Sequence, residues 1–481
     1  MHRALLIAEV QHRIFQDCDK PSLASIASVC RQLHGIALEL LWVEVTSFKQ
    51  ILDCFPSHIW DVQPTLNNEP PAWFLQEYLC PDHLERYQFY APKIKRLTID
   101  NSNPTVDASF FTALAFLLND RPLFPNLAKL IWKSTSVPLA QLCSPTLKHL
   151  EVMLPNEFLY KSILNGLTLR CPTLHVLHVN FAGGAVQLSP SVQQWDSLKK
   201  LYFVGLKWSA IRHLARLPKL SVLHLTDLFI DDTLTQPFRG FPALMELQCD
   251  CVARGLLVLL DAVSSKLRKL MLSVLGHPAV GDWHNIFNSV ARNEWSQSLQ
   301  VVFLMQRSAR PTDSCVDFGI ISALLPIAQL RRLKIVAAFL KIRDEDCWKI
   351  AQSWPKLQYL SLKSIKSTPP QGTFDSLRAF ATHCPSLRTL SLAFDARINN
   401  LVETENPYSA TTLQNLEAEG SPIQNPALVA ATLVDMFPQL AAATKGQNAD
   451  WVGVNNLLAP MAAVRAQEHG RRQSLQMSMS F

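Results

Sequence analysis

A short phrase recurs along this chain, and it constrains the fold more than any other feature of the sequence. It reads WPKLQYLSL at 354–362, CPSLRTLSL at 384–392 and LPKLSVLHL at 217–225. The shared pattern is P-x-L-x-x-L-x-L, in which a proline that stiffens a turn precedes the apolar residues. The period-two spacing of the last two leucines places them on one face of a short strand. Because such self-similarity is typical of stacked supersecondary units, the chain is expected to be a repeat protein.

The first apolar residue of the phrase, here called the anchor, occurs thirteen times at an average spacing of about 27 residues, within the range of about 20–29 that is typical of leucine-rich repeats. The anchors are Ile94, Leu127, Leu147, Leu174, Leu198, Leu220, Leu244, Leu267, Leu299, Leu330, Leu357, Leu387 and Leu413. Segments between them, such as 107–119, 316–325 and 344–353, show the 3–4 spacing of helices. We therefore predict an α/β fold over residues 91–418. It is an irregular leucine-rich-repeat solenoid of about thirteen units, with a parallel concave sheet and a helical convex side.

The composition favours a protein with a buried core over a disordered chain, since 48% of the residues are apolar and 17% are charged. The net charge is only +6 and no run of five like charges occurs, so nucleic acid is not expected as a partner. The eleven cysteines contain no C-x-x-C pair, and Cys249 with Cys251 supplies too few ligands for zinc. We therefore expect buried free thiols and no metal site.

Neither a membrane span nor a secretory signal is expected. No apolar run approaches the ~18 residues of a membrane helix, and the apolar run Leu5–Ile7 is too short for a signal peptide. We therefore expect an intracellular protein of the cytoplasm, the nucleus or both. The sequence also lacks the common phosphate-binding, nucleophile-elbow and zinc-protease motifs, so we expect no catalytic residues, no cofactor and no enzymatic activity.

The concave face of the predicted sheet is a candidate protein-binding surface. Residues between the strand leucines point towards it, and its central row is Thr98, Ile131, Glu151, His178, Tyr202, His224, Gln248, Met271, Phe303, Lys334, Ser361, Ser391 and Glu417. Aromatic, histidine and methionine side chains gather in this row, so we predict substrate contacts at His178, Tyr202, His224, Met271 and Phe303. The alternative is that the face simply tolerates these side chains. Three rows together carry eight basic and six acidic residues, which argues against a phosphate-binding track.

Residues 2–45 form a separate helical unit in this interpretation. Leu6, Val10 and Ile14 mark a first amphipathic helix, and a second begins at Pro21 with Ser22 as its cap. A third helix is expected after Gly35. We expect a helical connector over residues 46–90, a C-terminal cap helix within 419–469 that is interrupted at Pro460, and a disordered tail over 470–481.

The N-terminal unit resembles an F-box, most of all that of the F-box/leucine-rich-repeat proteins abundant in basidiomycete fungi. The resemblance is carried by the runs LLIAEV at 5–10, IF at 14–15, LASIASVCR at 23–31 and LLW at 40–42. Ala8 stands where the family usually has proline, and Cys18 where leucine is commoner.

The resemblance implies a substrate receptor of an SCF-type cullin-RING ubiquitin ligase. The helices would dock on a Skp-type adaptor, and through it on a cullin, while the repeats hold an unknown protein substrate. It places adaptor contacts at Leu6, Ile7, Val10, Val29, Leu41 and Trp42. A first alternative is a repeat scaffold or inhibitor without a ubiquitin role, whose N-terminal helices only cap the solenoid. A second is a regulator of a GTPase or a nuclease.

Overall fold

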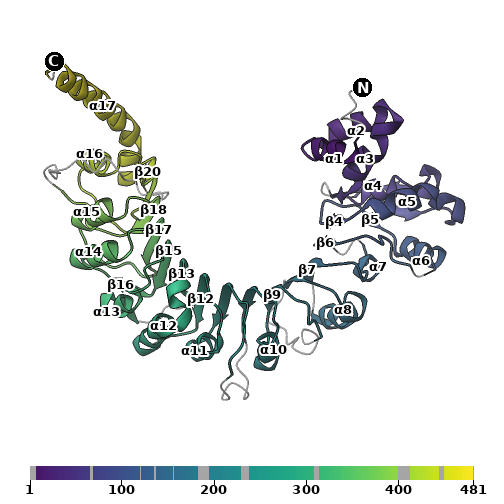
Figure 1. The fold of residues 1–481 in the computed structure, drawn as a ribbon, viewed down its shortest axis with the longest axis horizontal. Coiled ribbons are helices and arrows are strands. Elements are labelled where there is room, and N and C mark those ends of the chain that lie inside the picture. The colour runs from purple at the N-terminus through teal and green to yellow at the C-terminus, as the bar shows by residue number, and fades with distance from the viewer. Residues whose placement is uncertain are drawn as a thin grey trace. The chain divides into compact units, whose positions relative to one another are not determined.

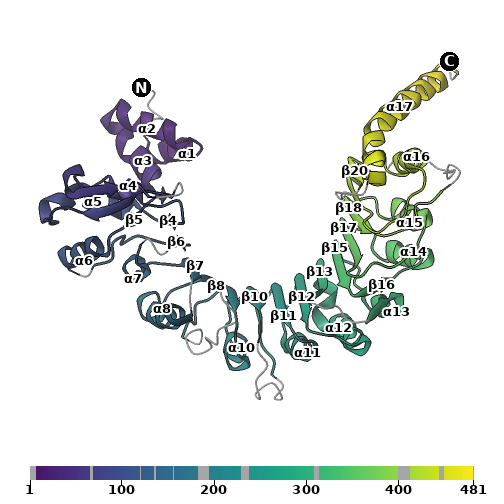
Figure 2. The same ribbon diagram turned by 180° about the vertical axis from the view of Figure 1, so that it is seen from behind.

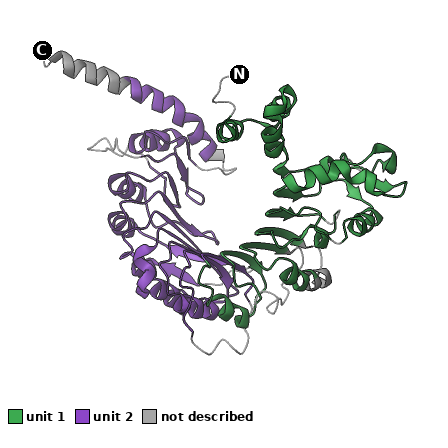
Figure 3. Ribbon diagram, turned by 45° about the vertical axis from the view of Figure 1, so that its right-hand side comes forward, with its two compact units in different colours: residues 1–220 green, residues 221–481 purple. Residues whose placement is uncertain are grey.

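The computed structural model describes residues 7–65, 69–119, 121–134, 137–154, 157–181, 194–228, 238–307, 314–398, 412–443 and 449–479. They fall into two compact units, residues 1–220 and 221–481 (Figure 3). Each unit is described by itself.

Unit 1 begins with three short helices, α1 (Ala8–Phe15), α2 (Lys20–Val29) and α3 (Arg31–Trp42) (Figure 1). Their small core consists of five buried residues, Phe15, Leu23, Ala27, Ala37 and Leu38. The helix α2 is capped by Asp19, whose carboxylate accepts a hydrogen bond from the Ser22 amide at 2.9 Å, and not by Ser22 as predicted. The helix α3 begins at Arg31 and passes through Gly35, because the extended backbone of Cys30 already separates it from α2.

The prediction of a helical connector over 46–90 is incomplete. Helices α4 (Lys49–Leu52) and α5 (Glu85–Tyr90) are present, but strands β2 (Trp60–Gln63) and β3 (Ala72–Leu75) form an antiparallel hairpin between them. The strand β5 (Thr105–Val106) adds to β3 in parallel. The hairpin carries Trp60 and Trp73, whose rings pack edge to face with centroids 5.4 Å apart. Aromatic residues of this kind favour strands. The prolines around them break a helix but do not prevent the hairpin, so the aromatic residues are the better guide here.

The parallel sheet of unit 1 starts before the first predicted repeat. The strand β1 (Glu44–Val45) pairs with β4 (Arg96–Ile99), so the sheet already begins within residues 2–45. The strands β6 (Lys129–Trp132), β7 (His149–Leu154), β8 (Val176–Phe181) and β9 (Lys200–Val204) follow in order, each parallel to the one before it. The helices α6 (Ala108–Leu117), α7 (Leu139–Leu142), α8 (Glu157–Arg170) and α10 (Trp208–Leu214) lie on one side of these strands (Figure 2).

Unit 2 continues the same strand-turn-helix plan. Its parallel strands are β10 (Val222–Thr226), β11 (Glu246–Cys251), β12 (Lys269–Leu275), β13 (Val301–Arg307), β15 (Arg332–Ala337), β17 (Tyr359–Ser364), β18 (Thr389–Leu392), β19 (Asn415–Glu417) and β20 (Ala442–Ala443). Helices on one side are α11 (Ala253–Ala262), α12 (Val280–Arg292), α13 (Phe318–Ile321), α14 (Asp344–Ser353) and α15 (Phe374–His383) (Figure 2). The predicted fold class, a leucine-rich-repeat solenoid with helices on one face, is confirmed.

One segment that was predicted to be a helix, residues 316–325, consists of the end of a strand, a single helical turn and a 3-10 turn. Residues 316–325 begin in β14 (Cys315–Asp317), which pairs in parallel with β16 (Phe339–Lys341) on the helical side of unit 2. Only the single turn of α13 and a following 3-10 turn (Ser322–Leu324) are helical. Val316 and Ile320 fit helical spacing, but Val316 is buried as a strand residue. Apolar runs of this length do not separate strand from helix.

The repeated phrase stabilises the sheet in a simple way. In unit 2, Leu333, Leu360 and Leu390 are register partners on consecutive strands, and all three are fully buried. Each buried leucine contributes about 1.5–3 kcal/mol. The repeats lack the turn asparagine of regular arrays, and neighbouring repeats supply the missing hydrogen bonds. The Ile365 amide, for example, donates to the Ala337 carbonyl at 2.8 Å.

The C-terminal helices close the sheet of unit 2. After α16 (Pro426–Met436), α17 (Ala449–Met479) packs against α16 and β20, with Trp451 and Val454 buried. The Asn455 side chain accepts a hydrogen bond from the Ala443 amide at 2.8 Å, and so pairs a backbone group of the last strand. The helix continues through Pro460, where an interruption was expected, and over residues 470–479, where disorder was expected. Those ten residues include arginine, glutamine, leucine and methionine, which favour helices.

Candidate functional site

The face of the sheet that the helices do not cover is here called the open face. The predicted central row of this face exists within each unit. In unit 1, strand pairing places Thr98, Ile131, Glu151, His178 and Tyr202 side by side on consecutive strands. In unit 2 the same holds for His224, Gln248, Met271, Phe303, Lys334, Ser361, Ser391 and Glu417. The five predicted substrate contacts therefore form two groups, His178 with Tyr202 in unit 1 and His224, Met271 and Phe303 in unit 2.

The unit 1 group is an aromatic pair. The rings of His178 and Tyr202 lie with centroids 4.9 Å apart and planes 40° from parallel, and both side chains are half-buried. Beside them, the Lys133 ammonium lies 3.0 Å from the Glu151 carboxylate. The pair offers a partly apolar contact surface next to a neutralised charge pair.

In unit 2, His224 belongs to a charge cluster. Its Nε2 atom lies 2.8 Å from Oε1 of Glu246, and the same oxygen lies 2.5 Å from the Lys269 ammonium. Burial raises the pKa of Glu246, but the hydrogen bonds from Lys269 and His224 outweigh it, so the net pKa is below its ordinary value. The His224 side chain thus makes an intramolecular contact on the open face.

A cation and two aromatic rings gather further along the open face of unit 2. The rings of Phe303 and Tyr359 have centroids 6.0 Å apart, and the Arg332 guanidinium lies 5.9 Å from the first centroid and 5.3 Å from the second. Met271 is the register partner of Phe303 on the neighbouring strand. The sequence predicted Met271 and Phe303 as contacts but missed Tyr359. Tyr359 lies on β17 two residues before Ser361 of the central row, in the row that flanks the central one on the open face. Including that flanking row would have found it.

Two serines of the central row are buried, although the row was expected to be exposed. Ser361 and Ser391 carry small side chains between longer neighbours, and their hydroxyl groups have no hydrogen-bond partner among the described residues. Beside them, the Lys363 ammonium lies 2.9 Å from the Glu417 carboxylate and 3.5 Å from that of Glu419. These longer side chains lie on the same face of the sheet and shield the serines from solvent.

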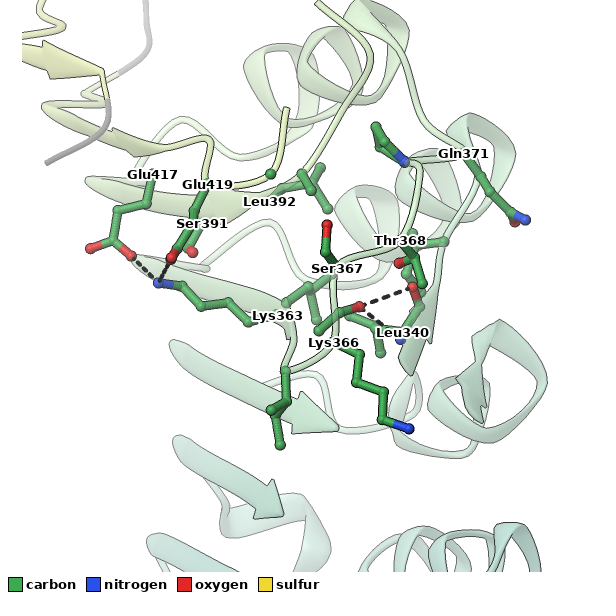
Figure 4. A pocket seen from close by; sticks show the side chains of 17 residues that line it. Leu340, Lys363, Lys366, Ser367, Thr368, Gln371, Ser391, Leu392, Glu417 and Glu419 are labelled. Carbon is green, nitrogen blue, oxygen red and sulfur yellow. Dashed lines mark hydrogen bonds and ion pairs between the residues drawn. The ribbon is translucent and has the colours of Figure 1, made fainter. Parts of the chain in front are cut away.

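A cavity of about 300 Å³ lies at the carboxyl ends of β17 and β18 (Figure 4). Its lining includes Lys363, Thr368, Ser391, Glu417 and Glu419, together with apolar side chains. Figure 4 shows Lys363 extended towards the two glutamates, so two carboxylates share one ammonium at this side of the cavity, while Lys366 adds a second cation to the lining. The lining suits a small polar group without indicating the sign of its charge.

The predicted adaptor contacts differ in their exposure to solvent. Leu6 lies outside the described residues, and Val10 is half-buried. Ile7 and Val29 are 50% and 68% exposed. By contrast, Leu41 and Trp42 pack against the core of the three helices. Ile14, which the sequence placed on the first apolar stripe but not among the contacts, is also exposed.

The described residues offer neither a metal site nor a disulfide. They contain no group of three or more histidine, cysteine, aspartate or glutamate residues able to hold a metal ion. All eleven cysteines are free, and seven of them are buried. None of the described helices combines the length and the hydropathy needed to cross a membrane.

Comparison with known proteins adds little to this geometry. No family model matches the chain, and no curated protein matches it. Solved structures that do match include a leucine-rich-repeat protein of Leptospira interrogans, 16% identical over 66% of this chain and 90% of that one, with a TM-score of 0.27. This likeness is too distant to bear on function, and the assignment of the repeat fold stands on the register of the strands.

Proposed function

We propose that the chain is the substrate-recognition subunit of an SCF-type cullin-RING ubiquitin ligase. Helices α1–α3 dock on a Skp-type adaptor, and through it on a cullin, in the cytoplasm or the nucleus. The open face of the repeats binds the protein substrate. The chain itself catalyses nothing and needs no cofactor; it brings the substrate close to the subunits that transfer ubiquitin.

The observation that carries this proposal is the exposure of apolar side chains on the small helical unit. Three helices within about 35 residues bury only a small core, which is marginal for a free-standing domain. They nevertheless leave Ile7, Ile14 and Val29 exposed. Exposed apolar side chains in such a unit are a reason to expect a protein partner, and the F-box resemblance of residues 2–45 implies a Skp-type adaptor as that partner.

The open sheet face supports the second half of the proposal. Within each unit, the helices that follow the strands lie on the opposite side of the sheet (Figures 1 and 2). The open face carries half-buried aromatic and methionine side chains, including Tyr202, Met271 and Phe303. Aromatic residues and methionine are enriched in protein interfaces.

Co-purification with a Skp-type adaptor tests the proposal directly. We expect the wild-type chain to retain the adaptor and the variants Ile7→Asp and Val29→Asp to lose at least tenfold in affinity. The matched control is Val280→Asp, which places the same charge at a 49% exposed valine of α12. Circular dichroism checks that all variants fold. If the wild-type chain does not bind the adaptor, the proposed role in a ubiquitin ligase is wrong.

The alternative of a scaffold or inhibitor has its own support. Leu41 and Trp42 pack inwards, and Ala8 replaces the proline usual in F-boxes. In that case the helices only cap the first strands of the array. Capture of a protein partner through the open face, without any adaptor binding, would establish this alternative.

A further inference from the structure

We propose that strands β13, β15 and β17 form a docking site for an extended acidic segment of a partner protein. The segment carries two carboxylates two residues apart, next to an apolar side chain. This inference rests on the proposed function only in assuming that the open face of unit 2 binds protein; it does not require the adaptor.

Ion pairs on this face leave two cations of β15 without a carboxylate partner among the described residues. Lys269 is paired with Glu246, Lys363 with Glu417 and Glu419, and Arg307 with Asp250. Arg332 and Lys334, which lie between these pairs, make no ion pair with any described residue. Among the part of the chain that the structure describes, the site therefore presents two uncompensated positive charges, which attract a segment of opposite charge.

The spacing of the two charges matches that of alternate side chains in an extended peptide. Arg332 and Lys334 are two residues apart on β15, so both point to the open face, about 7 Å apart along the strand. Carboxylates at alternate positions of an extended peptide have the same spacing and also lie on one face. A segment lying along β15 can therefore satisfy both cations together.

Two aromatic rings form a platform for the Arg332 guanidinium. Phe303 is the register partner of Lys334, and Tyr359 is the register partner of Arg332. Contact with both rings holds the exposed Arg332 guanidinium in place while its N–H groups remain available to a carboxylate. Such preorganisation lowers the entropy lost on binding. The half-buried side chains of Phe303 and Met305 provide apolar surface for the neighbouring residue of the segment.

The surrounding charges limit where the acidic segment lies. Towards β18 and β19, the two carboxylates of Glu417 and Glu419 share the single ammonium of Lys363, which leaves that side acidic. Towards β11 and β12, Glu246 is already held by His224 and Lys269. An acidic segment is therefore repelled on one side and finds no uncompensated cation on the other, so it is confined to β13, β15 and β17.

A library of immobilised twelve-residue peptides, probed with the full-length protein, tests this inference. The peptides carry two aspartates or glutamates separated by zero, one, two or three residues, with and without an adjacent phenylalanine or leucine. We expect the strongest binding at a separation of one residue with the apolar neighbour present. If peptides with all four separations of the acidic residues bind equally well, the proposal is overturned. The same holds if only peptides with phosphoserine in place of the acids bind.

Charge reversal at the site sharpens the test. We expect the double variant R332E/K334E to lose at least tenfold in affinity for the best acidic peptide and to gain binding of the same peptide with lysines for the acids. The control, K266E/K356E, makes the same change in net charge at two exposed lysines outside the helices and strands and should stay within twofold of wild type. If R332E/K334E binds the acidic peptide as well as wild type does, the site is wrong.

The two proposals fail separately. A chain that retains the adaptor but selects no acidic peptide overturns the docking site alone. A chain that binds the acidic peptide through Arg332 and Lys334 but never retains the adaptor overturns only the ubiquitin-ligase role.

Discussion

Trp42 stacks on Tyr90, with ring centroids 4.2 Å apart and planes 21° from parallel. The first residue ends helix α3 and the second ends helix α5, so this contact joins the N-terminal helices to the segment that leads into the repeats. Trp42 was predicted to contact an adaptor. Its ring lies against the chain's own Tyr90, whereas the side chains of the predicted contacts Ile7 and Val29 are exposed.

Replacing Trp42 with alanine should therefore loosen the N-terminal helices. We expect a loss of roughly 2 kcal/mol in their local stability, less than the about 3–5 kcal/mol for a fully buried tryptophan, because Trp42 is only half-buried. Hydrogen exchange of the α1–α3 amides measures the effect. Trp42→Phe keeps an aromatic ring and should restore most of the protection. Unchanged exchange in Trp42→Ala would show that the stack does not join these segments.

The repeat sheet could be predicted because the recurring phrase P-x-L-x-x-L-x-L marks both the position of each strand and its register with the next strand. All thirteen anchors are buried, and each precedes a parallel strand. The flanking strands β1 and β20 were missed. The strand β20 follows Pro438 and Leu440, which begin the phrase, but the sequence has Ala443 and Lys445 at the two positions of the strand leucines. The burial of Ser361 and Ser391 and the stack of Arg332 on two rings depend on neighbours from other repeats, which no local pattern reveals.

The anchors should dominate the stability of the array. We expect Leu357→Ala, at a fully buried anchor, to cost about 2–5 kcal/mol. Ile365→Ala, eight positions later and 42% exposed, should cost less than about 1 kcal/mol. Since repeat arrays need not unfold in one step, urea unfolding should be followed by fluorescence and by hydrogen exchange of β17. Similar losses in both variants would contradict the role of the anchors.

The Glu246 cluster predicts a dependence of stability on acid pH. Although burial raises the pKa of Glu246, hydrogen bonds from Lys269 and His224 bring it below its ordinary value of 4.5 in the folded protein. Its contribution is therefore present above pH 4.5 and is lost as the pH falls through the lowered pKa. We expect the melting temperature of wild type to fall more steeply below pH 4.5 than that of Glu246→Gln. Parallel curves for the two proteins would show that the cluster does not hold the carboxylate in its charged form.

The cysteines predict which thiols react in the folded chain. Cys249, Cys251, Cys347 and Cys384 are fully buried, and burial raises the pKa of each of the last three to about 12. Little reactive thiolate forms there near pH 8.

At pH 8, iodoacetamide should therefore modify the four partly exposed thiols of the native protein within minutes. These are Cys18, Cys30, Cys80 and Cys315, and Cys315 should react more slowly than it would with an ordinary pKa, because burial raises the pKa of its thiol. The remaining seven should react only after denaturation. Cys171 is the informative case, since a hydrogen bond from Cys143 lowers its pKa, yet the side chain is fully buried and out of the reagent's reach. Mass spectrometry of tryptic peptides locates the modified residues. Rapid native labelling of Cys249 or Cys251 would mean that β11 is not packed inside the array, because the reagent reaches a thiol only where the strand is open to solvent.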